Sequence, residues 1–202
     1  DHSLDAAITD IRKADTARRT VIAAGIRELA GGFAAQSAER PVAEIRPHFE
    51  AAARLLRAGR SSLDVWAAFA LARLAVVQQR HDEVVSRATA VTERAKRIGA
   101  AAVAARAHWL LGMTAFTLNN WSAAMRHYEE ALRLCEATAE TTLAASVHLN
   151  ASVLNRFLGN VGATWRHRLI AGAGLPAYRR VQRHTYLTSG AVTASTESLP
   201  LT

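Results

Sequence analysis

The sequence predicts an all-α protein, built as an α-solenoid of antiparallel helix pairs. Alanine is abundant, only 11 glycines and 4 prolines occur in 202 residues, and aromatic residues make up 6%, which is typical of a helical chain. Signals for chain reversal recur near Arg80, Asn120 and Asn160, about 40 residues apart, and the apolar residues between them follow helical spacing. We therefore expect at least six helices between Thr16 and Ala171.

The N-terminal part contains one clear amphipathic helix and one helix whose start is set by proline. Residues 1–15 form a lead-in segment with few apolar side chains to bury. Thr16–Ala35 carries apolar residues at three-and-four spacing, and Gly31-Gly32 weakens its end. Proline suits the first turn of a helix but costs about 3 kcal/mol inside one. The sequence therefore predicts a short turn from Pro41 and a regular helix over Pro47–Ala58.

The next two helices have start signals of a common kind. Ser61 or Ser62 is expected to cap the first of them, with Asp64 in its first turn, because side-chain oxygens accept hydrogen bonds from the free N–H groups there. After the reversal near Arg80, Asp82 is expected to cap a helix that runs to Arg97. These two helices form the second predicted pair.

The central stretch Ala105–Thr138 predicts a helical hairpin with a close helix contact. Two asparagines within Leu118–Trp121 favour a tight reversal. Gly112 and Ala124 have almost no side chain, so the two backbones can approach there. We expect these two residues to face each other across the hairpin, with Tyr128 filling the space that they leave.

This hairpin resembles a tetratricopeptide repeat (TPR) in its order of small and large residues: Leu111, Gly112, Ala124, Tyr128 and Ala131. It departs from the family pattern at His108, Ala115 and Glu136. The resemblance implies a helical solenoid that binds partners, and it implies no reaction. A period of about 40 residues exceeds the usual 34 or so, and such longer repeats are similar to sensor modules of bacterial regulatory proteins.

The last part of the chain predicts one more pair and then a change of character. Ala137–Phe157 reads as one long helix whose apolar stripe is interrupted by Asn150, and a partner helix covers Ala163–Ala171. The repeat domain is therefore placed at residues 16–171. Residues 172–202 are expected to form a helix break, a short basic helix and a flexible tail rich in Ser and Thr. The first pair, which ends at Gly59, fits the period only with a slip of a few residues.

The net charge of +8 is unevenly distributed along the chain. No Asp or Glu occurs between Thr141 and Thr196, a span that contains the expected basic patch of Arg166, Arg168, Arg179, Arg180 and Arg183. One interpretation is a basic face for an acidic partner or a nucleic acid. The other is a solvated surface in a chain that uses arginine in place of lysine.

Catalytic and metal sites find little support in the sequence. It contains no glycine-rich phosphate loop, no nucleophile elbow and no HExxH motif, so we expect neither an enzyme nor a cofactor. Eight histidines include His108 and His148 at one repeat position, but no two histidines lie four residues apart on one helix, and no metal site is predicted. The single cysteine, Cys135, lies in an apolar stripe and is expected to be a buried thiol, as in a cytoplasmic protein.

Two function classes remain. The first is a non-catalytic interaction or sensory module that binds a protein or peptide in a groove lined by polar residues of the apolar stripes: His108, His148, Asn150, Asn155 and Arg156. Because the chain starts with Asp1 rather than Met, we expect it to belong to a larger regulator. The second is a nucleic-acid-associated helical repeat protein that uses the basic C-terminal segment. We also expect no membrane contact, since no apolar run reaches roughly 18 residues, and self-association through the end repeats.

Overall fold

The computed structural model describes residues 2–174, and this part of the chain forms nine α-helices and no strand. The prediction of an all-α fold is confirmed for these residues. The predicted basic helix and Ser/Thr-rich tail lie outside the described part, after residue 174. The helices are α1 (His2–Lys13), α2 (Thr16–Ser37), α3 (Val42–Ala58), α4 (Asp64–Val77), α5 (His81–Ile98), α6 (Ala101–Thr117), α7 (Trp121–Thr138), α8 (Thr141–Phe157) and α9 (Val161–Gly174).

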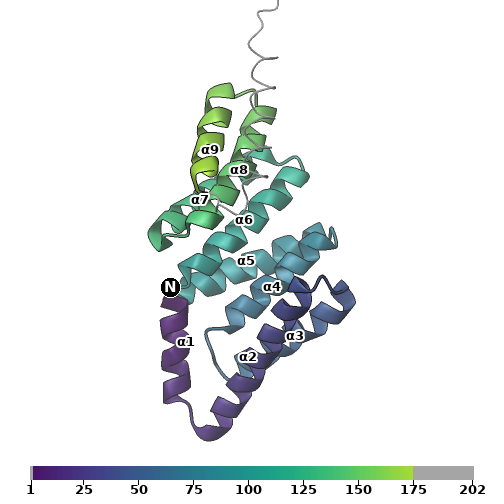
Figure 1. Ribbon diagram of the computed structural model, residues 1–202, viewed down its shortest axis with the longest axis vertical. Coiled ribbons are helices and arrows are strands. Elements are labelled where there is room, and N and C mark those ends of the chain that lie inside the picture. The colour runs from purple at the N-terminus through teal and green to yellow at the C-terminus, as the bar shows by residue number, and fades with distance from the viewer. Residues whose placement is uncertain (1, 175–202) are drawn as a thin grey trace, which may run out of the picture.

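From α2 to α9, helices that follow one another in the chain pack against each other. Helix α6 also contacts α4 and α8, so the first helices of successive pairs touch as well. Figure 1 shows the pairs arranged along the long axis, with α2 and α3 at one end and α8 and α9 at the other. Buried side chains form separate clusters between neighbouring helices rather than one central core. None of the described helices combines the length and the apolar character of a membrane span.

The helix boundaries repeat with a period of 40 residues from the first pair onward. Helices α2, α4, α6 and α8 end at positions 37, 77, 117 and 157, and α3, α5 and α7 end at 58, 98 and 138. The turn inside each pair has one residue with positive φ, again 40 apart: Glu39, Gln79, Asn119 and Gly159. The predicted slip in the first pair is therefore wrong. The irregularity lies in the link 59–63, which delays the start of α4.

Helix α2 starts at Thr16 as predicted and ends at Ser37, two residues beyond the predicted Ala35. Within it, Gly32 serves a close contact, since a Cβ there would lie 2.5 Å from Cε1 of Phe49. The predicted start of the next helix is wrong, for a reason of packing. Helix α3 starts at Val42 and contains Pro47. Proline lacks the N–H that would donate one backbone hydrogen bond of the helix. Ile45 and Phe49, on the two sides of Pro47, are 4% and 0% exposed, and their burial keeps the helix continuous across the proline.

The predicted serine contact forms just before α4 rather than at its N-cap. Leu63 occupies the N-cap position without a side-chain hydrogen bond of its own, and the buried Ser61 accepts from the N–H of Leu63 through Oγ at 3.4 Å. The N–H of Ser62 instead donates to Asp10 of α1 at 2.9 Å, which ties the lead-in helix to the array. Asp64 lies in the first turn as predicted, and α5 begins one residue before the predicted cap, Asp82.

The chain reverses between α7 and α8, where the sequence predicts a continuous helix from Ala137. Ala139 adopts φ 55° and ends α7, as Gly99 with φ 70° ends α5 one period earlier. An alanine in the left-handed region carries no signal in the sequence, which explains the error. At the other end of this pair, α9 extends through Gly172 to Gly174, beyond the predicted stop at Ala171.

The central hairpin packs closely, with a different partner for its glycine than predicted. The three atoms nearest to a Cβ built on Gly112 all belong to the ring of Tyr128, the first at 2.5 Å. Ala124 is buried in the same cluster, but Gly112 does not have it as its nearest neighbour. The flat ring of Tyr128 therefore lies directly over the backbone of α6, which only glycine permits.

Candidate functional site

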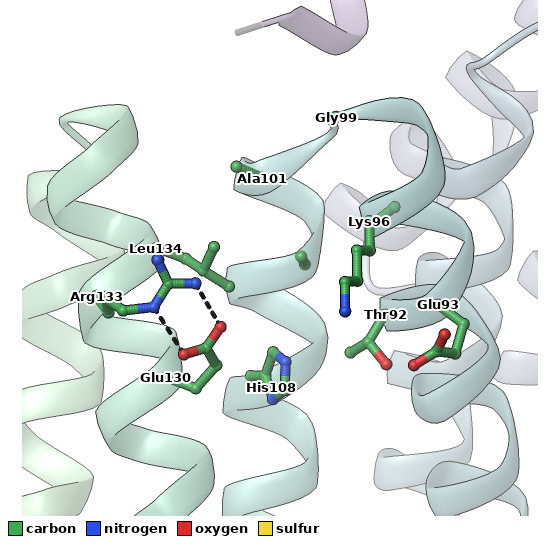
Figure 2. Close-up of a pocket in the computed structure, with 11 residues that line it drawn as sticks. Thr92, Glu93, Lys96, Gly99, Ala101, His108, Glu130, Arg133 and Leu134 are labelled. Carbon is green, nitrogen blue, oxygen red and sulfur yellow. Dashed lines mark hydrogen bonds and ion pairs between the residues drawn. The ribbon is translucent and has the colours of Figure 1, made fainter.

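A groove lies between α5 and α7 above the surface of α6, and we call it the α5–α7 groove. Its volume is about 500 Å³, in the range of ligand sites. Small side chains form its floor, namely Ala95, Ala101 and Ala104, and Leu134 lies at the α7 side. Figure 2 shows the polar residues on three sides: Thr92, Glu93 and Lys96 from α5, His108 from α6, and Glu130 and Arg133 from α7.

The charged groups of this groove are only partly matched with one another. Arg133 donates to both carboxylate oxygens of Glu130, at 2.8 and 2.6 Å. This bond lowers the pKa of Glu130, to which the charge of Lys96 also contributes, and it raises the pKa of Arg133. Within residues 2–174, Glu93 and Lys96 form no ion pair. An ammonium group and a carboxylate therefore remain available on the α5 side.

The repeat provides an internal comparison for this groove, because the next hollow lies 40 residues further along the chain. It measures about 390 Å³ and includes Leu132, Cys135, Glu136, Ala144 and His148. Small residues recur at equivalent positions (Ala95 and Cys135, Ala104 and Ala144), as does the histidine.

The charged residues of the α5–α7 groove do not recur one period later. Thr92 corresponds to Leu132, and Lys96 corresponds to Glu136. Glu130 and Arg133 correspond to Ile170 and Ala173. The packing of successive helix pairs therefore does not require this charged set.

Two pairs of histidines cross the last two hairpins at equivalent positions. Nδ1 of His108 lies 3.1 Å from Nδ1 of His127, and Nδ1 of His148 lies 2.8 Å from Nδ1 of His167. Burial lowers the pKa of all four imidazoles, and the pKa of His148 falls to about 4, with the charge of His167 as a second cause. Each pair is thus neutral at pH 7 and joins two helices.

The predicted groove residues do not share one surface. His108 and His148 lie under successive hollows on the α5, α7 and α9 side. Asn155 is buried, at 4% exposure, and its side chain donates to the carbonyl of Ala151 in its own helix. Arg156 is exposed and lines a separate hollow of about 270 Å³ on α8 and α9.

Asn150 has a role between helices rather than at a surface. Its Oδ1 accepts from Nε1 of Trp109 at 3.5 Å, which links α8 to α6. Burial raises the pKa of Tyr128 to about 12, while Asn150 acts in the opposite direction. Within the described chain, however, the Tyr128 hydroxyl has no partner in hydrogen-bonding geometry. The Tyr128 hydroxyl and Asn150 therefore form a polar spot beside the apolar side chains that pack between α6, α7 and α8.

The predicted basic patch is not assembled in the described part. Arg166 is exposed on α9, but Arg168 is only 9% exposed and its guanidinium lies 5.7 Å from the centre of the Trp165 ring. Arg179, Arg180 and Arg183 lie outside the described residues. Residues 2–174 also bring together no three histidine, cysteine or acidic side chains that could hold a metal ion.

Sequence reasoning missed both the charged groove and the histidine pairs. A signal existed for each of them. Lys96 is one of only two lysines in the chain, and the members of both histidine pairs are separated by the same 19 residues. A recurrent separation across a predicted hairpin could have indicated the pairing.

Comparison with known proteins defines the class of fold and goes no further. No family model matches the chain, and no curated protein matches it. Among solved structures, it is similar to the crystal structure of BtubC (BKLC) from P. vanneervenii, with 16% sequence identity and a TM-score of 0.53. The match covers 93% of this chain and 95% of that one. Residues 2–174 thus form an all-helical fold of a known type.

Proposed function

We propose that this chain is a non-catalytic interaction or sensory module with a TPR-like solenoid fold, part of a larger bacterial regulator. We further propose that the α5–α7 groove binds a segment of a protein or peptide partner. The observation that carries the proposal is the charged set of this groove, which the repeat does not need for its packing. The regular period of 40 residues and the packing of successive pairs support the solenoid fold.

The chemistry of the groove favours a segment that presents a carboxylate and a small apolar side chain. Lys96 offers an ammonium group without an ion-pair partner among the described residues, and His108 offers an imidazole on the floor. The alanines between them offer an apolar surface on which a small side chain loses water at little cost. The Glu130–Arg133 pair closes the opposite side.

The test uses the two lysines of the chain as a matched pair. A phage-displayed library of random heptapeptides is selected on the full chain, and the selected peptides are measured against Lys96→Ala and Lys13→Ala variants. We expect acidic peptides whose binding weakens about 10-fold or more with Lys96→Ala, the equivalent of about 1.4 kcal/mol, and is unchanged by Lys13→Ala. Bound peptide should also protect Lys96, but not Lys13, from an amine-specific reagent. Peptides that bind both variants equally would refute the proposal that the α5–α7 groove is the binding site.

The alternative function, nucleic-acid binding, is distinguished from partner binding by its dependence on salt concentration. A protein that neutralises several phosphates loses affinity steeply with salt. Labelled duplex and single-stranded oligonucleotides are titrated at two salt concentrations. Tight, sequence-dependent binding at physiological salt would replace our proposal, whereas weak binding that vanishes with salt would leave it in place.

A further inference from the structure

Four of the eight histidines form two pairs, and of these four only His108 also lines the α5–α7 groove. Each pair joins the two helices of one hairpin, α6 to α7 and α8 to α9. The same two positions are used in both hairpins, 40 residues apart. A chance contact between two surface imidazoles would not be expected to recur in this way.

The two imidazoles of each pair point their Nδ1 atoms at each other along one line. The ring centres lie 5.4 Å apart where the nitrogens are 3.1 Å apart, and 5.1 Å apart where the nitrogens are 2.8 Å apart. In both pairs the distance between the ring centres exceeds the distance between the Nδ1 atoms by twice the distance from the centre of an imidazole ring to its own nitrogen. Such a difference is reached only when both nitrogens lie on the line between the ring centres. The two lone-pair directions therefore oppose each other.

Two opposed nitrogens of this kind can share a proton or, after moving apart, bind one metal ion between them. In the neutral pair, a hydrogen bond requires that one ring carries its proton on Nδ1 and donates, while the other ring accepts. A metal ion on the same line would bind both Nδ1 lone pairs, and both rings would then carry their protons on Nε2. The number of protons is the same in both states, so at neutral pH the ion binds without releasing a proton.

The ligand set and its direction select the ion. Zinc takes four ligands in a tetrahedron, and calcium and magnesium take six or more oxygens, whereas each pair supplies two opposed nitrogens. Cu(I) and Ag(I) are soft monovalent ions that accept two nitrogens in a line. At metal–nitrogen distances of about 2 Å, the nitrogens would separate to about 4 Å, roughly 1 Å beyond their present spacing. Partly buried side chains at the helix surface can open by that amount.

We propose that the His108–His127 and His148–His167 pairs are two binding sites for a monovalent soft metal ion of the Cu(I) type. This proposal does not depend on the partner-binding groove. The ion would fix α6 to α7 and α8 to α9, and it would stabilise the folded chain by an amount that grows with the logarithm of the free ion concentration.

The charged groups around each pair set the pH range of binding. Glu130, Arg133 and Arg126 of α7 face the first pair. Arg166 of α9 faces the second, and Glu136 and Glu140 lie in the same hollow as His148. Below the pH at which a pair takes up a proton, the metal must displace that proton, so affinity should fall with decreasing pH.

The test uses Ag(I), which has the same charge and preferred geometry as Cu(I) and is not oxidised by air. All samples carry Cys135→Ala, because a thiol would bind silver, and the buffer contains nitrate instead of chloride. Calorimetric titration should show two ions per chain at pH 7.5. His127→Gln and His167→Gln should each leave one ion, and the double variant none. His48→Gln, which breaks the 2.8 Å contact with Glu28 of another hairpin, is the matched control and should keep two.

Two further measurements distinguish a linear site from other causes. In ¹⁵N spectra of the imidazoles, silver should shift Nδ1 of all four histidines and leave every Nε2 protonated. A tenfold excess of Zn(II) should not displace silver. Two ions retained in the double variant, no uptake by the parent chain, or displacement by zinc would each overturn the proposal. Circular dichroism of the variants identifies any that has lost its helices, and for such a variant the ¹⁵N spectra of the parent chain decide.

Discussion

Replacing Gly112 by alanine should strain the contact that holds the central hairpin together. The added Cβ would lie 2.5 Å from Cε1 and 2.6 Å from Cδ1 of Tyr128, distances that carbon atoms do not tolerate. The ring cannot move away freely, because Tyr128 is 1% exposed. Overpacking of this kind costs about 1–3 kcal/mol, while exchanging glycine for alanine inside a helix gains up to about 1 kcal/mol. We therefore expect a net loss of about 1 kcal/mol.

Gly162→Ala provides the reference, since a Cβ at Gly162 would meet nothing within 4 Å. This variant should be neutral or slightly more stable than the parent chain. Stability is measured by urea unfolding followed by circular dichroism, and the difference between the two variants isolates the contact. In a double-mutant cycle, Tyr128→Leu should remove most of the penalty at Gly112. If Gly112→Ala is as stable as Gly162→Ala, the ring does not lie where the structure places it.

Two further predictions concern titrating groups. Burial raises the pKa of the Cys135 thiol to about 11, so its reaction with a disulfide reagent at pH 8 should be slow and should accelerate when urea unfolds the chain; rapid labelling of the folded protein would contradict this. In buffer with a metal chelator, acidification from pH 7.5 to 5 should destabilise the parent chain by about 1 kcal/mol more than His148→Gln, once partial exposure is allowed for. The pKa of His148 falls from 6.5 to about 4 on folding, so the unfolded chain binds the proton first, and equal pH sensitivity in urea unfolding would refute this.

The fold was predictable where local chemistry marks each boundary. Asn120 accepts a hydrogen bond from the N–H of Ala123, and Asn160 does the same for Ala163, so these turns carried a readable signal. Ala139 performs the role of Gly99 without being a glycine, and the next helix was therefore predicted to start at Ala137, four residues before its observed start at Thr141. Pro47 gave the opposite error, because tertiary burial outweighs the local cost of proline in α3.

The candidate site was less predictable, because polarity inside an apolar stripe has more than one cause. Asn155 satisfies its own helix by donating to Ala151, and Asn150 meets Trp109 on the neighbouring helix α6. Both side chains make hydrogen bonds within the protein and are not reserved for a binding partner. Lys96 lies on an exposed and otherwise ordinary helix surface, and only the position of α7 across the groove gives it a role. Such a role depends on the distance between elements, which sequence spacing does not contain.

The repeat itself separates structural from functional positions. Ala104 and Ala144 line the floors of two successive hollows, whereas the equivalent position of the preceding pair holds the buried Asp64. Lys96 is replaced by Glu136 one period later, and the fold accepts either charge. A lining residue whose charge differs between equivalent positions of the repeat is not fixed by packing, so it is free to serve recognition. We therefore assign the charges of the α5–α7 groove to the partner that binds there.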